Sequence, residues 1–367
     1  MAESRKCQVL VIGAGPGGYV AGIRSAQLGL DTIVVEGDKA GGTCLIRGCI
    51  PSKAIIHAAE RFESLRQHSA DGGHMGLSVK GEAEVDMVGL VSWKDSIVDR
   101  LNKGVEGLLK AAGADLIKGW ARFEGPKSCI IDTGAESVKI EAENVIIATG
   151  SSHIDLPFMP CDEEFVISST GALDLEALPK SVAIVGGGYI GLELGCALAK
   201  LGSKITVVEG MSSVLAIMDK EIRRPLEIWL KKHKVTVHTD SLARGVEIKG
   251  RGASKKAELT FEKDGTEHKV KVDKVLVTVG RKPNTKGWGL ENTGVRMDGS
   301  GRFIRTDRQC RTSVPGVYAI GDVSGEPMLA HKASAEGEMV AEIIAGHKRE
   351  FDKIAIPAIV FTEPEIV

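Results

Sequence analysis

Apolar and polar residues follow one another along the chain in a pattern that predicts alternating strands and helices. Two short apolar runs, 8–12 and 182–185, each open into a glycine-rich turn. Each turn is followed by a helical stretch and then by a second apolar run, 32–36 or 204–209. This order is typical of a βαβ unit with parallel strands. The pattern therefore predicts an α/β protein in which one βαβ unit occurs twice.

The rest of the chain contains longer helices and shorter strands. The spacing of apolar residues predicts helices over 49–67, 85–112 and 332–345. Strands are predicted at 234–238, 275–279 and 316–322, with several short ones within 115–147. The polar, glycine-rich residues 69–84 predict a loop or a hairpin.

Both glycine turns have the spacing Gly-x-Gly-x-x-Gly, formed by Gly13, Gly15 and Gly18 and again by Gly186, Gly188 and Gly191. One such turn alone is weak evidence, because ordinary βαβ turns also contain glycine. Here each turn follows a strand and precedes a helix, whose N-terminus offers free N–H groups to a pyrophosphate. We therefore predict two Rossmann-like dinucleotide-binding domains.

An acidic residue ends the second strand of each unit. Glu36 follows Gly13 by 23 residues, and Glu209 follows Gly186 by the same 23 residues. A carboxylate at this position accepts hydrogen bonds from ribose hydroxyls and repels a 2′-phosphate. Both residues therefore favour FAD or NAD over NADP, the alternative being two solvated strand ends.

Composition narrows the class of protein further. The 367 residues correspond to two or three domains of ordinary size. Glycine accounts for 45 of them, about 12%, against an average of about 7%. The net charge of −2 argues against a nucleic-acid scaffold, and we expect no membrane span because no long apolar run occurs. Without a secretory leader, the cytoplasm is the expected location.

Two of the seven cysteines, Cys44 and Cys49, lie five residues apart directly after the first βαβ unit. In a regular helix such residues are about 8–9 Å apart at Cα, and a disulfide needs less than about 7 Å. A bridge here would therefore require a distorted helix start, with which Gly48 is compatible. A zinc site with His57 and a pair of inert core cysteines are the alternatives. We favour a redox pair and expect no metal site.

Several motifs in one order carry a resemblance to a known family. They are the loop at 13–18, the cysteine segment 41–53, the loop at 186–191, and the segments 278–284, 318–322, 328–331 and 361–365. The chain resembles the flavin-dependent pyridine nucleotide–disulfide oxidoreductases, and within them the subgroup that oxidises dihydrolipoamide. The residues that follow Cys44 and Cys49 resemble this subgroup, whereas Ile46 and Arg47 depart from its usual pattern.

The resemblance implies the site residues. Cys44 is the outer sulfur, Cys49 lies against the flavin, and Lys53 and Glu193 form a pair at the reactive edge of the flavin. Further residues implied to hold FAD are Gly13, Gly15, Gly18, Glu36, Gly42, Thr43, Lys53, Gly119, Thr149, Gly150, Asp322 and Ala330. Those implied to hold NAD are Gly186, Gly188, Tyr189, Ile190, Gly191, Glu209 and Gly280.

The resemblance also implies a domain order and partners. The FAD-binding domain covers 1–152 and resumes over 281–354, the NAD-binding domain covers 153–280, and 355–367 would be the first strand of an interface domain. The partner would be the lipoyl domain of a 2-oxo acid dehydrogenase acyltransferase core, or a glycine-cleavage carrier protein. The family is homodimeric.

One family element is not found in the sequence. The family's acid–base histidine lies in a His-x-His-Pro-Thr-x-x-Glu segment, and none of the nine histidines here precedes a proline. We therefore expect a chain that lacks most of the interface domain. The main hypothesis is oxidation of dihydrolipoamide with reduction of NAD. An FAD- and NAD-binding fragment with only diaphorase activity is the second hypothesis, and an NAD-linked disulfide reductase for another small substrate is the third.

Overall fold

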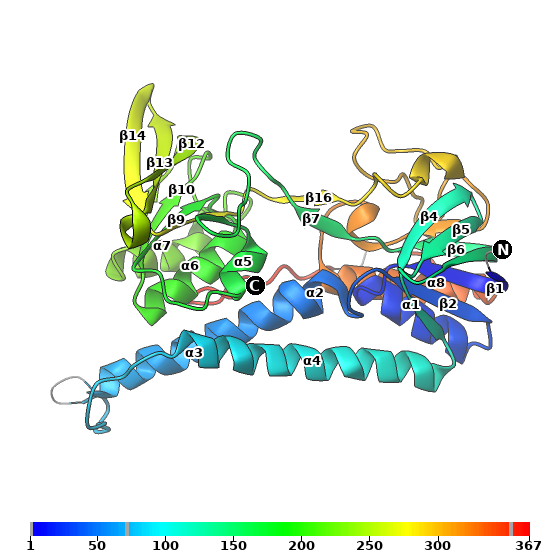
Figure 1. The fold of residues 1–367 in the computed structure, drawn as a ribbon, viewed down its shortest axis with the longest axis horizontal. Coiled ribbons are helices and arrows are strands. Elements are labelled where there is room, and N and C mark those ends of the chain that lie inside the picture. The colour runs from blue at the N-terminus through cyan, green and yellow to red at the C-terminus, as the bar shows by residue number, and fades with distance from the viewer. Residues whose placement is uncertain (1–2, 70–72, 352–354) are drawn as a thin grey trace. The chain divides into compact units, whose positions relative to one another are not determined.

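The computed structural model describes residues 3–69, 73–351 and 355–367 (Figure 1). Its internal contacts group the chain into two compact units. Unit 1 comprises residues 1–46, 98–152 and 282–357. Unit 2 comprises residues 47–97, 153–281 and 358–367. Each unit is therefore assembled from three separate stretches of sequence.

Unit 1 is built on a seven-stranded mixed sheet. Its parallel strands are β1 (Glu3–Ile12), β2 (Thr32–Glu36), β3 (Asp115–Lys118), β6 (Ser137–Ile147) and β17 (Val317–Ala319). The antiparallel strands are β4 (Trp120–Gly125) and β5 (Ser128–Asp132). The order is β3-β2-β1-β6-β5-β4, with β17 paired to β6. Parallel strands in an order that places β1 between β2 and β6 are typical of a nucleotide-binding βαβ fold.

Helices pack on this sheet and on one another. Unit 1 contains α1 (Pro16–Gln27), α8 (Ala330–Ile344), most of α2 (Gly42–Arg47) and the second half of α4 (Met87–Ala112). Helices α1 and α8 approach closely, since a side chain on Gly337 would overlap with the carbonyl oxygen of Gly17. Arg24 on α1 also forms an ion pair of 2.7 Å with Glu342 on α8. The core of the unit includes Leu10, Ile131 and Ile147, all fully buried.

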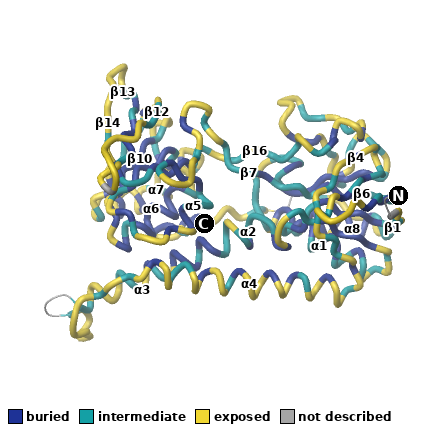
Figure 2. The backbone as a smooth tube through the Cα atoms, in the orientation of Figure 1, coloured by how far each residue is buried: buried dark blue, intermediate teal, exposed yellow. Residues whose placement is uncertain are grey.

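Unit 2 is built on a parallel five-stranded sheet. Its strands are β8 (Val166–Ile167), β9 (Ser181–Val185), β10 (Lys204–Val208), β11 (Thr236–His238) and β15 (Lys274–Val277), in the order β11-β10-β9-β15-β8. The helices are α3 (Cys49–Ser69), α5 (Ser169–Leu173), α6 (Tyr189–Leu201), α7 (Lys220–Lys232) and the first half of α4. The central strand β9 lies in the buried class over most of its length (Figure 2). The second predicted βαβ unit is thus β9-α6-β10.

A three-stranded antiparallel sheet follows in unit 2, formed by β12 (Ser241–Lys249), β13 (Lys256–Lys263) and β14 (Thr266–Val272). This sheet was not predicted from the sequence. Asp264 and Gly265 between β13 and β14 both have positive φ, at +50° and +72°. An Asp-Gly pair between two strands is the strongest local signal of a hairpin, and it was present in the sequence.

The remaining short elements connect the larger ones. Strand β7 (Ser151–His153) pairs with β16 (Arg281–Pro283). Short 3₁₀ helices cover Gly252–Ser254, Leu290–Thr293 and Gly321–Val323. The predicted helices at 49–67, 85–112 and 332–345 correspond to α3, α4 and α8, with bounds that differ by a few residues.

The prediction of a strand over 355–367 was wrong. In the described part of this segment only an isolated bridge joins Val360 to Ile366. Pro357 and Pro364 have no N–H to donate, which disfavours a regular ladder. Instead, Val360 and Ile366 are buried in the core of unit 2. The segment therefore stabilises unit 2 through side-chain packing.

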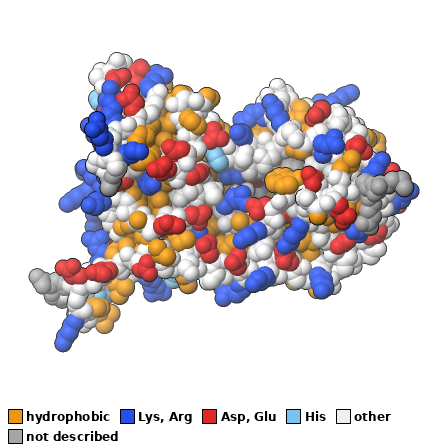
Figure 3. All heavy atoms as spheres, in the orientation of Figure 1, with side chains coloured by type: hydrophobic (Ala, Val, Ile, Leu, Met, Phe, Trp, Pro, Cys, Tyr) orange, Lys and Arg blue, Asp and Glu red, His pale blue; other side chains and the backbone are white. Residues whose placement is uncertain are grey.

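Basic and acidic side chains are interspersed on the face in Figure 3. This mixture agrees with a net charge of −2 and a sequence pI of about 6.5. Among the described residues, no helix has the length and apolar character needed to cross a membrane.

Candidate nucleotide-binding and dithiol site

The first glycine loop joins β1 to α1 and is tightly packed. Gly13 has φ of +99°, and a Cβ at this position would overlap with the carbonyl oxygen of Ala148 at the end of β6. A Cβ on Gly18 would in turn overlap with the carbonyl oxygen of Gly13. Gly15 is the N-cap of α1, and no side chain caps the helix there. The amide groups at the start of α1 are therefore arranged to receive an anion such as a pyrophosphate.

The second loop repeats this construction in unit 2. Gly186 has φ of +103°, and a Cβ there would lie 2.5 Å from the carbonyl oxygen of Thr278 after β15. A Cβ on Gly191 would lie 2.5 Å from the carbonyl oxygen of Gly186. Gly188 is the N-cap of α6, again without a side-chain cap. The two loops thus require glycine for the same physical reasons, and both fit a dinucleotide.

The two acidic strand ends occupy equivalent positions. The Glu36 carboxylate accepts a hydrogen bond of 2.8 Å from the N–H of Ala14, and the Glu209 carboxylate accepts one of 2.5 Å from the N–H of Gly187. Each donor is the residue that follows the first glycine of its loop. A carboxylate held in this way has further lone pairs for ribose hydroxyls. Its charge also excludes a 2′-phosphate.

Other predicted FAD residues lie around the first loop in unit 1. A Cβ on Gly42 would lie 2.5 Å from Cα of Gly15, so the start of α2, where Thr43 lies, adjoins the loop. The N–H of Gly119 donates to the backbone oxygen of Glu36 over 2.8 Å. Both positions therefore lie at the end of the sheet where the loop and Glu36 are found.

The turn after β6 is fixed by hydrogen bonds within unit 1. The Thr149 hydroxyl donates to the carbonyl oxygen of Asn284 over 2.9 Å, and the Asn284 amide donates to the carbonyl oxygen of Thr149 over 2.9 Å. The N–H of Asn284 donates to the carbonyl oxygen of Gly150 over 2.9 Å. Asn284 belongs to the segment 278–284 that resembles the family, but no role was predicted for it. Its position directly after β16 was the available signal.

Asp322 follows β17, in the last of the three stretches of sequence that make up unit 1. Its carboxylate accepts a hydrogen bond of 2.5 Å from the Ser151 hydroxyl. The neighbouring N–H of Gly321 donates to Glu336 over 2.6 Å, and burial raises the pKa of Glu336. Ala330 begins α8 a few residues later. Ser151 and Glu336 were not predicted from the sequence, because only tertiary contacts reveal their partners.

The cysteine segment lies at an interruption between two helices. Cys44 is in α2, which ends at Arg47, and Cys49 is the first residue of α3. The predicted distortion at the helix start is confirmed, since Gly48 belongs to neither helix. Both cysteines are half-buried. Burial, with a smaller contribution from Cys44, raises the pKa of Tyr19, which lies on α1.

Of the other five cysteines, four are buried and Cys161 is half-buried. Burial raises the pKa of the Cys7, Cys161 and Cys196 thiols to about 12, and it also raises the pKa of Cys129 and Cys310. Thiols of this kind form little thiolate at neutral pH, and the thiolate is the reactive form. These five cysteines are therefore unsuited to disulfide exchange.

Lys53 and Glu193 are in direct contact within unit 2. The Lys53 ammonium on α3 lies 2.8 Å from the Glu193 carboxylate on α6. The Glu193 side chain is only 4% exposed, and its second oxygen accepts a hydrogen bond of 3.0 Å from the N–H of Phe361. The Lys53 ammonium also lies 4.4 Å from the centre of the Phe361 ring. A pair that could have been two surface charges is thus a specific ion pair.

Neither Tyr189 nor Ile190 is deeply buried at the start of α6, and Gly280 is exposed with φ of +120°. The carbonyl oxygen of Gly280 accepts a hydrogen bond of 3.1 Å from Ile154. These three residues lie in unit 2 with the second loop, as the predicted NAD site requires.

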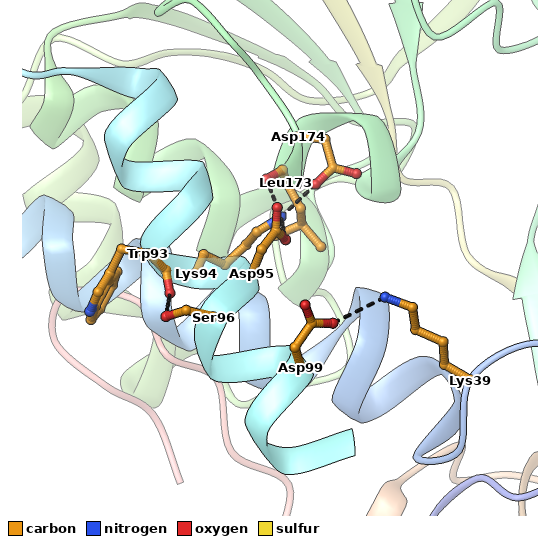
Figure 4. A network of polar contacts seen from close by, with 8 residues as sticks. All are labelled: Lys39, Trp93, Lys94, Asp95, Ser96, Asp99, Leu173 and Asp174. Carbon is orange, nitrogen blue, oxygen red and sulfur yellow. Dashed lines mark hydrogen bonds and ion pairs between the residues drawn. The ribbon is translucent and has the colours of Figure 1, made fainter. Parts of the chain in front are cut away.

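One buried charge has a role in the fold. Lys94 on α4 is 3% exposed, and its ammonium contacts Asp95 at 2.9 Å and Asp174 at 2.5 Å (Figure 4). It also donates to the carbonyl oxygen of Leu173 over 3.0 Å. These partners offset the cost of burying the ammonium group. They attach α4 to α5 within unit 2.

The two glycine loops, the two acidic strand ends and the cysteine segment define a class of protein. The family model described as pyridine nucleotide-disulphide oxidoreductase matches residues 7–337. The chain belongs to this family, whose members use FAD and a pyridine nucleotide.

Among its curated relatives are proteins named dihydrolipoyl dehydrogenase. The one from Pseudomonas aeruginosa is 47% identical over 368 residues, which cover 100% of this chain and 77% of the relative. The one from Geobacillus stearothermophilus is 45% identical over 358 residues, which cover 98% of this chain and 74% of the relative. The chain thus spans about three quarters of the length of these relatives.

Solved structures confirm the fold. LpdA from Mycobacterium tuberculosis matches with a TM-score of 0.87 and 28% identity, covering 98% of this chain and 77% of that structure. A Cu(II) complex of RclA, an HOCl-induced flavoprotein disulfide reductase from Escherichia coli, matches with a TM-score of 0.83 and 25% identity, covering 98% and 76%. The predicted fold, two Rossmann-like domains of an FAD/NAD-linked reductase, is therefore confirmed.

Proposed function

We propose that this chain is a flavoprotein disulfide oxidoreductase that oxidises a protein-bound dihydrolipoyl group and reduces NAD. The observation that carries the proposal is the combination of two equivalent dinucleotide loops with a cysteine pair at a broken helix. Several relatives of 43–47% identity named dihydrolipoyl dehydrogenase support the choice of substrate.

Unit 1 is the proposed FAD site. Gly13, Gly15 and Gly18 admit the pyrophosphate to the N-terminus of α1, and Glu36 holds the ribose. Further contacts come from Gly42, Thr43, Gly119, Thr149, Gly150, Asp322 and Ala330. FAD, when bound, supplies the two-electron chemistry that links the dithiol to NAD.

Cys44 and Cys49 exchange with the substrate as a disulfide. A dihydrolipoyl thiolate attacks the Cys44 sulfur, so the Cys44–Cys49 bond breaks and Cys49 leaves as a thiolate. The second lipoyl thiol loses its proton and attacks the substrate sulfur of the mixed disulfide. The lipoyl disulfide closes, and Cys44 leaves as a thiolate. The substrate thus loses two electrons and two protons, and the cysteine pair gains the electrons.

Lys53 and Glu193 are the proposed charged pair at the flavin edge. The buried Glu193 carboxylate fixes the ammonium of Lys53, and its hydrogen bond to the N–H of Phe361 fixes the carboxylate in turn. A cation so placed would favour thiolate and reduced forms near it by Coulomb attraction. The pair thereby positions charge and takes no part in sulfur exchange.

The NAD site belongs to unit 2. Gly186, Gly188 and Gly191 admit the pyrophosphate to the N-terminus of α6, and Tyr189, Ile190 and Gly280 line the site. Glu209 selects NAD, because its carboxylate repels a 2′-phosphate. The proposed partner is the lipoyl domain of a 2-oxo acid dehydrogenase complex or a glycine-cleavage carrier protein, in the cytoplasm. The proposed oligomer is the homodimer of the family.

A second candidate function is diaphorase activity alone. Transfer of electrons from NADH to an artificial acceptor requires only the two nucleotide sites, whereas turnover of dihydrolipoamide also requires the cysteine pair.

The decisive experiment compares electron acceptors and two variants on the FAD-loaded 367-residue chain. We expect NADH to reduce lipoamide but not glutathione disulfide. Cys44→Ser and Cys49→Ser should abolish lipoamide reduction while ferricyanide reduction remains. Anaerobic reduction should also give a long-wavelength absorption band that is lost in Cys49→Ser. Ferricyanide reduction without lipoamide reduction would favour the second candidate. Lipoamide reduction that survives Cys49→Ser would contradict the cysteine assignment.

A further inference from the structure

Three metal-ligating side chains meet in unit 2, apart from the nucleotide loops and the cysteine pair. The ligand atoms of His153, Asp155 and Cys161 all lie within 4.8 Å of one another. His153 Nε2 lies 3.3 Å from Asp155 Oδ1. The His153 and Asp155 side chains are 35% and 46% exposed, and Cys161 is half-buried. The group is therefore accessible from solvent.

Hydrogen bonds and packing hold the backbone between His153 and Cys161. The N–H of Ile154 donates to the carbonyl oxygen of Gly280 over 3.1 Å, which fixes the chain between His153 and Asp155. The N–H of Met159 donates to Leu156 over 2.8 Å and closes the turn that brings Cys161 back. The Met159 side chain is 2% exposed and anchors this turn in the core.

The chain after Cys161 is held as firmly. Oδ1 of Asp162 accepts hydrogen bonds of 2.8, 2.7 and 2.9 Å from the N–H groups of Glu164, Phe165 and Val166. This oxygen is therefore committed to the turn, which leaves His153, Asp155 and Cys161 as the converging ligands. A loop whose backbone is already fixed loses little conformational entropy when its side chains bind a metal ion.

The charge around the group favours a cation. The carboxylates of Asp155, Asp162 and Glu163 all act electrostatically on the Cys161 side chain. A soft divalent ion that replaces the thiol proton would interact favourably with both the thiolate and these carboxylates.

We propose that His153, Asp155 and Cys161 form a Zn²⁺ site with one position open to solvent. Tetrahedral zinc has bonds of about 2.0–2.3 Å to nitrogen, oxygen and sulfur, which places its ligands about 3.3–3.6 Å apart. The distance between His153 and Asp155 already has this value. The Cys161 sulfur lies within 4.8 Å of both other ligand atoms, so it would need to move by no more than about 1 Å.

The ligand types select the ion. A thiolate and an imidazole favour zinc and similar transition metals over Mg²⁺ and Ca²⁺, which prefer oxygen ligands. The site does not depend on the proposed oxidation of dihydrolipoamide, because none of its residues belongs to the proposed catalytic or nucleotide-binding sets. It can therefore be tested whatever the electron acceptor of the protein is.

The experiment titrates the oxidised, FAD-loaded chain with Zn²⁺ by isothermal calorimetry in two buffers of different ionisation enthalpy. We expect one ion to bind and about one proton to be released from Cys161. Mg²⁺ should not compete. Co²⁺ should give a thiolate charge-transfer band in the near ultraviolet. Cys161→Ser should remove this band, and Cys161→Ser and His153→Gln should each weaken Zn²⁺ binding at least tenfold.

Two controls separate this site from the other candidates. The double variant Cys44→Ser/Cys49→Ser should bind Zn²⁺ as the unaltered chain does, and so should His57→Asn. FAD content and thermal unfolding of the His153 and Cys161 variants show whether they are folded. Zn²⁺ binding that is unchanged in folded Cys161→Ser, or that disappears with the Cys44 and Cys49 thiols, would overturn the proposal.

Discussion

Glu193 and Lys53 form an ion pair in which the acid is almost completely buried and the base is partly exposed. The ammonium and the carboxylate are 2.8 Å apart, and the side chains of Glu193 and Lys53 are 4% and 31% exposed, respectively. Glu193 also accepts a hydrogen bond from the N–H of Phe361. Its carboxylate therefore joins α3, α6 and the segment after residue 358 within unit 2. Removal of its charge should therefore affect the stability of the whole unit.

We predict that Glu193→Gln destabilises the protein by about 1–3 kcal/mol, below the full cost of breaking a buried pair because Lys53 keeps contact with water. Urea unfolding measures the change. The matched control in the same unit is Glu262→Gln, whose partner Arg244 lies 3.0 Å away with 51% of its side chain exposed. That control should cost less than about 1 kcal/mol. Equal losses in the two variants would argue against a special role for Glu193.

Alanine in place of the first glycine of either loop should disrupt that loop. Gly13 and Gly186 have φ of +99° and +103°, and a Cβ on either would collide with a carbonyl oxygen of the neighbouring strand end. Gly13→Ala should lower FAD content after purification, and Gly186→Ala should weaken NADH binding at unchanged FAD content. Flavin absorbance and NADH titration measure these effects.

The control for this prediction is Gly107→Ala on α4. Gly107 is exposed, and its Cβ would meet no atom within 4 Å. Because alanine is the better helix former, the change should stabilise the protein by about 0.5–1 kcal/mol. Full FAD content in Gly13→Ala would show that the close approach to Ala148 is not needed for binding.

The two acidic strand ends should control two different cofactors. Glu209→Gln removes the charge that repels a 2′-phosphate, so the preference for NADH over NADPH should fall about tenfold. Glu36→Gln should reduce FAD retention instead. Binding titrations with both nucleotides and flavin content after dialysis measure the outcomes. If Glu209→Gln lowered FAD retention and Glu36→Gln changed the NADH preference, the two sites would have been assigned in reverse.

Thiol counting should separate Cys44 and Cys49 from the other five cysteines. At pH 8 a thiol reagent should react quickly with two thiols after reduction of the folded protein, and with none before. The other five thiols, including half-buried Cys161, have raised pKa values and therefore little thiolate at this pH. Unfolding in denaturant without reductant should expose five thiols, and unfolding with reductant should expose seven. More than two fast thiols in the reduced, folded protein would contradict this assignment.

The raised pKa values of the buried thiols predict how the stability of the protein depends on pH in the alkaline range. The pKa of Cys7 and Cys196 in the folded protein is about 12, above the ordinary 9.0. Between these values the folded state binds more protons than the unfolded state, so the free energy of unfolding falls as the pH rises. Cys7→Ala should make urea unfolding less dependent on pH between 9 and 12. An unchanged slope would show that Cys7 does not contribute.

The elements with a strong local signal could be predicted from sequence, and those defined by distant partners could not. The two glycine loops and the acids 23 residues after their first glycines were predictable, because pyrophosphate binding demands a fixed order of strand, glycine and helix. The broken helix at Gly48 followed from the spacing of the cysteines. In contrast, Ser151 and Asn284 acquire their roles only from residues more than 130 positions away.

The segment 355–367 shows a different limit, since its strand was inferred from the resemblance to the family. A strand also requires a partner edge, and among the described residues only the segment's own bridge supplies one. Val360 and Ile366 are buried in the core of unit 2 instead. Resemblance to the family therefore did not establish the secondary structure of this segment.

The pairing of β17 with β6 has a consequence for the order in which the protein can form during synthesis. The strand at Val317–Ala319 completes a sheet that begins at Glu3, whereas the five-stranded sheet of unit 2 is complete by Val277. The ribosome therefore releases all strands of the second sheet before the last strand of the first. Until residue 319 emerges, Val145–Ile147 of β6 can pair only with β1, and their other edge has no partner strand. The unit that begins first is thus the last whose sheet can be completed, and an open strand edge of this kind is prone to misassembly.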